Sequence, residues 1–169
     1  MTVLVAYSSK HGSTKGIAEA IADRLRELGE PVEVGSVDEV VDLAGFRAVV
    51  LGSAVYAGSW MKEAVEFVHR FAEPLAERSV WLFSSGPLGT DVEDQEEQPR
   101  QLGEMSGIIG PIDHQMFFGA LDRNSLGFGE RMLVKAVKAP DGDFRNWDTI
   151  RGWADGIARE LGVGSGTEG

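Results

Sequence analysis

Alternation between short apolar runs and helical patterns is the feature that most restricts the fold of this chain. Residues 3–7 are almost continuously apolar, as in a strand that is buried on both faces of a parallel sheet. Similar runs follow, each bounded by Gly, Pro or polar residues, at residues 32–37, 48–52, 80–84 and 116–120. Each run has the length of one strand, so the sequence predicts five strands separated by other structure.

Between these runs, apolar residues recur at three- and four-residue steps, which is the period of a helix with one buried face. The clearest pattern covers residues 17–28, and Gly29 followed by Pro31 supplies a stop signal. The same spacing predicts helices over residues 61–72, 102–109, 128–139 and 150–161. Asn146 and Asp148 are candidate N-caps of the last helix. Strands that alternate with helices predict a doubly wound α/β sandwich with right-handed crossovers.

The length of 169 residues fits one domain with a single core, which we expect over residues 1–161. Residues 162–169 are rich in Gly and Ser and are expected to form a flexible tail. Residues 85–112 fit the alternation least well, because Gly, Pro and acidic residues dominate there and only residues 102–109 suggest a short helix. We interpret this segment as a loop on the active-site side.

Composition and charge exclude several classes of protein. Hydrophobic residues make up 43% and charged residues 25% of the chain, which is typical of a globular domain. The formal net charge of −11 repels nucleic acid and anionic lipid, whereas a basic protein partner is an alternative. No apolar run approaches the ~20 residues of a membrane span, so we expect no integral membrane segment and a cytoplasmic location. The chain has no Cys, and redox chemistry therefore requires a cofactor.

A hydroxyl-rich turn between the first strand and the first helix is the strongest functional signal. It consists of Ser8, Ser9, Lys10, His11, Gly12, Ser13 and Thr14. A turn at this place directs backbone N–H groups and the positive end of the helix dipole toward one point, which suits a phosphate. The glycine patterns of dinucleotide and triphosphate loops are absent, so a mononucleotide monophosphate fits better. The alternative is an ordinary hydroxyl-capped turn, because Ser and Thr are also preferred N-caps.

This turn resembles the first loop of the flavodoxin family, in which Ser and Thr residues around one Gly wrap the phosphate of FMN. The motif positions are taken here by Ser8, Ser9, Gly12, Ser13 and Thr14. The resemblance implies FMN as the cofactor and a flavodoxin-like sandwich. That fold has five parallel strands in the order 2-1-3-4-5, helices on both faces, and the ligand at the carboxyl ends of the strands.

By the same resemblance, the loop after the third strand lies against the flavin ring. Its candidate cofactor-binding residues are Ala54, Val55, Tyr56, Ala57 and Gly58. Small residues permit close approach of the backbone, and Tyr56 offers a flat surface for stacking. Trp60 either stacks on the ring or packs with the helix that follows.

The loop after the fourth strand is the third expected contact with the flavin. Its candidate residues are Ser84, Ser85, Gly86, Pro87, Leu88 and Gly89. The glycines of this loop direct backbone N–H groups toward the ring, and a plain loop is the alternative. No aromatic residue occurs from Ser84 through Gln115, so one face of the ring is expected to stay open. An open face favours an oxidoreductase that admits a substrate or quinone over a one-electron carrier.

The C-terminal half carries a second set of motifs. Residues 119–121 form a Gly-Ala-Leu strand end, Lys135 and Lys138 are spaced along the following helix, and residues 146–147 are an Asn-Trp pair. In these features the chain resembles the group of flavodoxin domains that contains the menaquinone-dependent protoporphyrinogen oxidases. The chain departs from this group at residues 91–97, which are acidic where the group has a basic insertion.

The resemblance implies an FMN-binding oxidoreductase that exchanges electrons with a quinone, a small molecule or a redox partner protein. One alternative is an electron-transfer flavodoxin that serves a basic reductase. Another is a variant that binds the deazaflavin F420 or no cofactor. No residue is assigned a catalytic role. His11, His69 and His114 are scattered without ligand spacing, so we expect no metal site, and we interpret His69 and His114 as structural.

Overall fold

A parallel sheet forms the centre of the computed structural model, which describes residues 2–9, 13–56, 59–85, 102–117, 120–121, 142–143 and 146–162. Its strands are β1 (Thr2–Ser8), β2 (Val32–Ser36), β3 (Phe46–Tyr56), β5 (Ser79–Ser85) and β6 (Asp113–Phe117). They lie in the order β2-β1-β3-β5-β6, and every neighbouring pair in this order is parallel. Counted along the chain, the order of the parallel strands is 2-1-3-4-5, which confirms the predicted sheet.

The largest differences from the predicted strands lie in β3 and β6. β3 continues to Tyr56 instead of ending at residue 52, because β4 (Ser59–Trp60) folds back on it as an antiparallel partner. β6 begins at Asp113, earlier than the predicted residue 116, and Ala120 belongs to another strand. That strand, β7 (Ala120–Leu121), pairs with β8 (Gly142–Asp143) in a separate two-stranded antiparallel sheet.

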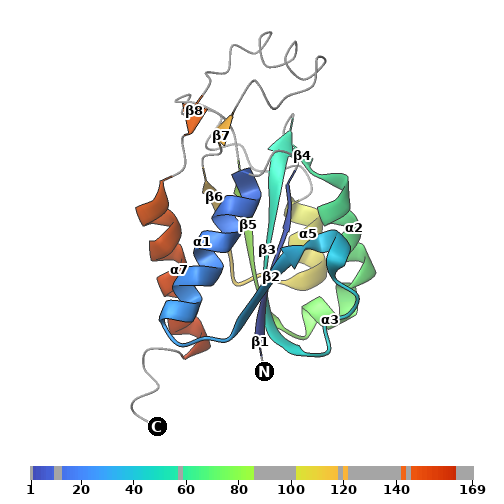
Figure 1. Ribbon diagram of the computed structural model, residues 1–169. Helices are drawn as coiled ribbons and strands as arrows, with labels where there is room; N and C mark the ends of the chain where they lie inside the picture. Colours follow the sequence, from blue (N-terminus) through green and yellow to red (C-terminus); the bar gives the residue numbers. More distant parts are fainter. Residues whose placement is uncertain are drawn as a thin grey trace.

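Helices cover both faces of the main sheet (Figure 1). α1 (Ser13–Glu27) and α7 (Trp147–Leu161) lie on one face. The other face is covered by the short 3-10 helix η1 (Val37–Glu39), α2 (Lys62–Arg70), α3 (Ala72–Ala76) and α5 (Leu102–Ile109). No helix in the described part of the chain has the length and apolar character needed to cross a membrane.

The helix ends follow local rules. Gly29, after α1, has a φ of 97°, a left-handed conformation that favours glycine, and it ends the helix as predicted. Asn146 caps α7, because its side chain accepts a hydrogen bond from the Thr149 N–H. The single helix predicted over residues 61–72 is broken at Phe71. Pro74 explains the break, since its ring would clash with the carbonyl four residues earlier in a continuous helix. The helix predicted over residues 128–139 lies outside the described residues.

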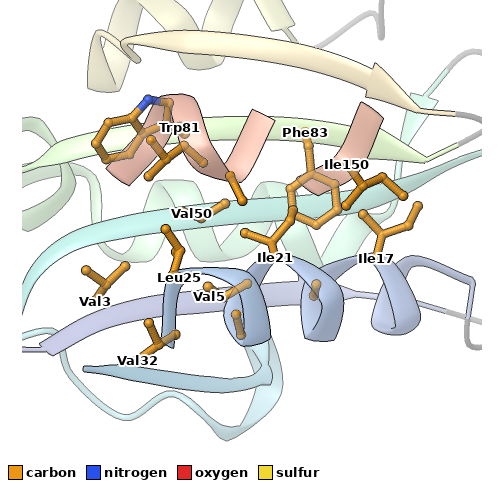
Figure 2. Close-up of a cluster of buried hydrophobic side chains, with 14 of the residues drawn as sticks. Val3, Val5, Ile17, Ile21, Leu25, Val32, Val50, Trp81, Phe83 and Ile150 are labelled. Carbon is orange, nitrogen blue, oxygen red and sulfur yellow. The ribbon is translucent and has the colours of Figure 1, made fainter. Parts of the chain in front are cut away.

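One of the two layers of core residues lies between the sheet and α1 with α7. Figure 2 shows Val5, Val50 and Phe83 pointing from the strands toward Ile17 of α1 and Ile150 of α7. These side chains are fully buried, and burial of each one stabilises the fold by roughly 1.5–3 kcal/mol. This core holds the strand that leads into α1 and the helix itself in fixed positions, and so defines the place of the turn between them.

Candidate functional site

The three predicted loops start from neighbouring strands. Ser8 on β1 is in register with Ser53 on β3, and Ser53 is in register with Ser84 on β5. Because the strands are parallel, the loops that follow these three serines leave from the same edge of the sheet (Figure 1). In an open α/β sheet, ligands bind outside this carboxyl edge.

Thr14 is the clearest sign of a ligand at this edge. It lies in the first turn of α1, is fully buried, and its Oγ1 atom has no hydrogen-bond partner among the described residues. A buried hydroxyl without a partner is destabilising, and native proteins rarely keep one without a reason. A phosphate oxygen at the start of α1 would accept this hydrogen bond and would also meet the positive end of the helix. The residues therefore fit a phosphate group.

The serines at the start of the loops face the α2 side of the sheet. Ser8 Oγ donates to Met61 Sδ at 3.5 Å. Ser53 Oγ accepts from the Met61 backbone N–H at 3.0 Å and donates to the Ala54 carbonyl at 2.8 Å. We call Ser8, Ser53 and Ser84 the serine row. Ser8 and Ser53 both contact Met61, which lies between β4 and α2. These hydroxyls therefore fix the start of α2 and the end of the hairpin formed by β3 and β4.

Trp60 lies in the core and not at the surface. It is 3% exposed, and its indole Nε1–H donates to Ser84 Oγ at 2.7 Å. This confirms the second of the two interpretations of Trp60, packing with the structure that follows. Sequence reasoning missed the role of Ser84 in this contact, because its partner is 24 residues away in the chain.

His114 contacts Ser84 on the same α2 side of the sheet, and so forms a polar group with Ser84 and Trp60. Its Nε2 atom lies 2.8 Å from Ser84 Oγ. Burial lowers the pKa of His114 from its ordinary value of 6.5, and the charge of Asp113 opposes this shift. Sequence reasoning interpreted His114 as structural, and the residue pattern gave no signal of its contact with Ser84.

The remaining predicted cofactor-binding residues divide into three groups. Ser9 and Val55 are partly buried, and Ala54, Ser84 and Ser85 are buried at the carboxyl edge. For Ser13 and Tyr56 the structure describes the backbone alone. The predicted residues outside the described part of the chain are Lys10, His11, Gly12, Ala57, Gly58, Gly86, Pro87, Leu88 and Gly89. Within the part that is described, no three His, Asp or Glu side chains are placed to hold a metal ion.

Comparison with known proteins agrees with this geometry. Residues 4–148 match the family model described as the flavodoxin domain. The chain belongs to the flavodoxin domain family. Membership of this family implies FMN as the cofactor, and the buried Thr14 hydroxyl fits the phosphate of that molecule. This flavodoxin domain is thus a flavin-binding electron-transfer protein.

Individual proteins are similar to this chain over most of its length. The flavodoxin domain is 22% identical to the Escherichia coli K12 protein named protoporphyrinogen IX dehydrogenase (quinone), over 94% of this chain and 95% of that protein. A solved flavodoxin of Streptococcus pneumonia TIGR4 covers 95% of this chain and 99% of its own, with a TM-score of 0.64 and 17% identity. The oxidised flavodoxin 2 of Bacillus cereus gives a TM-score of 0.63 and 22% identity, over 95% of this chain and 99% of its own. These two structures show that the fold is shared.

Proposed function

We propose that this flavodoxin domain is an FMN-dependent oxidoreductase that passes electrons between its flavin and a quinone or another small molecule. The observation that carries the proposal is the similarity to the E. coli protein named as a quinone-linked dehydrogenase, which extends over 94% of this chain and 95% of that protein. A similarity of this extent covers most of both chains.

The residues of the chain bind and orient the cofactor. In our assignment the start of α1 and the Thr14 hydroxyl hold the phosphate, with the other members of the turn, Ser8, Ser9, Lys10, His11, Gly12 and Ser13. Residues 54–58 and 84–89 hold the ring. When bound, FMN supplies the redox chemistry, which the side chains of a protein without Cys do not.

A reoxidation experiment tests this function. FMN-loaded protein is reduced anaerobically and mixed in a stopped-flow instrument with a soluble naphthoquinone. We expect reoxidation to be faster than that of free reduced FMN at the same concentration, and to saturate with quinone because the quinone binds. A rate equal to that of free FMN, linear in quinone, would contradict the proposal.

The net charge of −11 favours a second candidate, an electron-transfer flavodoxin that docks on a basic reductase. In the same instrument, a basic one-electron acceptor protein such as cytochrome c replaces the quinone. If docking is electrostatic, the rate falls steeply as salt is added, since salt screens the attraction between the two surfaces. Fast transfer to this acceptor together with no quinone saturation would favour the carrier.

Three further assignments complete the proposal. We infer one domain over residues 1–161, which the end of α7 at Leu161 supports, and of the tail predicted at 162–169 all but Gly162 lies outside the described residues. We also propose a cytoplasmic location, testable by cell fractionation, because a net charge of −11 disfavours anionic lipid surfaces. We expect the protein to bind FMN more tightly than the deazaflavin F420. A titration of the purified protein with each compound compares the two affinities directly.

A further inference from the structure

A buried chain of hydrogen bonds joins three elements beneath the proposed ring site. Trp60 on β4 donates from Nε1 to Ser84 Oγ on β5 at 2.7 Å, and Ser84 Oγ lies 2.8 Å from His114 Nε2 on β6. Ser84 is fully buried. β4 itself pairs with β3. These hydrogen bonds therefore link β4 to two strands, β5 and β6, with which it does not pair.

The chemistry of the three groups sets the direction of this chain. An indole N–H only donates, so the Ser84 oxygen accepts from Trp60. The proton of the Ser84 hydroxyl then requires an acceptor, and His114 Nε2, at 2.8 Å, is placed to accept it. His114 must for this purpose be neutral, with its proton on Nδ1.

The chain of hydrogen bonds fixes the hairpin that carries the proposed ring loop. Trp60 is the last residue of β4, and its partner across the hairpin is Val55. The next residue, Met61, is held through its backbone N–H by Ser53 of the serine row. The hairpin is thus attached on its returning side by Trp60 to Ser84 and by Met61 to Ser53.

We propose that His114 is a positioning residue for the flavin ring. By accepting the Ser84 proton it holds Trp60, and with it the β3–β4 hairpin, in the position that receives the ring. The inference rests on the proposed function, in which residues 54–58 contact the ring. Protonation of His114 reverses its role, because Nε2–H then donates to Ser84 and the buried Ser84 proton loses its acceptor. Acid pH is therefore expected to weaken flavin binding through this residue.

The charges around His114 agree with a neutral ring at ordinary pH. Burial lowers its pKa and the charge of Asp113 on the same strand raises it to a smaller extent. The helices over this face carry exposed ionisable groups, which are Lys62, Glu63, Glu66, His69 and Arg70 on α2 and Glu104 on α5. Among them, Lys62 pairs with Glu66 and His69 pairs with Glu104. None of these groups contributes to the shift of the His114 pKa.

Two substitutions separate positioning from mere packing. His114→Phe removes the acceptor and keeps an aromatic ring, whereas His114→Gln offers an amide oxygen that accepts from Ser84 and does not titrate. The control is His69→Gln, which removes an exposed histidine on α2. The dissociation constants of FMN and riboflavin are measured by flavin fluorescence between about pH 5 and 8.

The expected pattern has three parts. His114→Phe raises the dissociation constants of FMN and riboflavin by the same factor, about five- to tenfold, because the effect lies at the ring and not at the phosphate. His114→Gln restores most of the affinity and removes the loss at acid pH. The His69→Gln variant keeps the pH dependence of the unsubstituted protein. Equal flavin affinities for the unsubstituted protein and His114→Phe at every pH would overturn the positioning role.

A flavin-free measurement tests the same chain independently. The Trp60 indole N–H resonance, assigned with a Trp60→Phe variant, should shift with pH at the same midpoint as the His114 ring protons, and should be insensitive to pH over that range in His114→Gln. A Trp60 resonance whose chemical shift does not change at the titration midpoint of His114 would overturn the inference, even if His114→Phe fails to fold. Failure of the unsubstituted protein to bind any flavin would instead contradict the proposed function, and so the two failures are distinguishable.

Discussion

The ring of Phe83 on β5 lies directly against Gly52 on β3, so closely that a Cβ atom at Gly52 would overlap the ring. The two residues are in register on neighbouring strands of the sheet. Gly52 is therefore required for the close approach of a large side chain rather than for an unusual backbone angle.

We predict that Gly52→Ala destabilises the protein by about 1–3 kcal/mol, because the added methyl group overpacks a core with no free space. Urea unfolding followed by circular dichroism measures the change. The matched control is Gly107→Ala in α5, where a Cβ atom meets nothing within 4 Å and alanine favours the helix. Combining Gly52→Ala with Phe83→Leu should recover part of the loss. A Gly52→Ala variant as stable as the unsubstituted protein would show that Phe83 moves aside freely.

The unpartnered hydroxyl of Thr14 leads to two effects of opposite sign. Thr14→Val keeps the shape of the side chain and removes the buried polar atom. We expect the flavin-free protein to gain about 1 kcal/mol in free energy of unfolding, and FMN affinity to fall about tenfold. Calorimetric titration and thermal unfolding measure the two quantities. Thr149→Val, at an exposed position in the first turn of α7, is the control and should change neither. A Thr14→Val variant with unchanged FMN affinity would remove Thr14 from the phosphate site.

Glu30 and Arg47 form a partly buried ion pair whose loss should be measurable. Glu30 Oε1 accepts from Arg47 Nε at 3.2 Å and from Nη2 at 2.6 Å, and the Glu30 side chain is 3% exposed. Arg47→Ala leaves this buried carboxylate without its donor, and we expect a loss of about 1.5–3 kcal/mol in urea unfolding. Lys62→Ala, which breaks the exposed pair with Glu66, should cost about 0.5 kcal/mol or less. Equal effects of the two substitutions would refute the distinction between these pairs.

The lowered pKa of His114 predicts a pH dependence of stability with a definite sign. In the unfolded chain His114 titrates near 6.5, whereas burial lowers its pKa in the folded protein. Between these two values the unfolded state binds more protons, so the free energy of unfolding falls as pH is lowered through this window. The contribution is fully present above pH 6.5. In urea unfolding at several pH values, His114→Gln should show a weaker decline below pH 6.5 than the unsubstituted protein, and His69→Gln should show the same decline.

Most of the fold could be predicted from the sequence, because the central strands and the larger helices are defined by local patterns. The errors lie where tertiary partners override those patterns. Residues 53–56 are mixed in character, and they are strand because Ser53 and Ala54 pair with β5 and the two residues that follow pair with β4. Asp113, His114 and Gln115 are polar, so the apolar pattern did not include them, and they are strand because they pair with Trp81, Leu82 and Phe83 of β5.

The candidate site was predictable to a smaller extent. The turn before α1 has a residue pattern with a direct physical meaning, and the structure adds the burial of Thr14. The contacts of Ser84 with Trp60 and His114 were not predictable, because their partners are 24 and 30 residues away. Only the order and register of β3, β5 and β6 bring these side chains together.

A titration of the flavin-free protein with FMN and with riboflavin, by isothermal calorimetry, tests the central claim most directly. The two ligands share the same ring and differ in the phosphate. A phosphate site at the start of α1 predicts saturable binding of one FMN per chain, at least tenfold tighter than riboflavin, with this preference reduced about tenfold in Thr14→Val. Absence of FMN binding, or equal affinity for the two ligands, would contradict the assignment of the turn between β1 and α1 as a phosphate site.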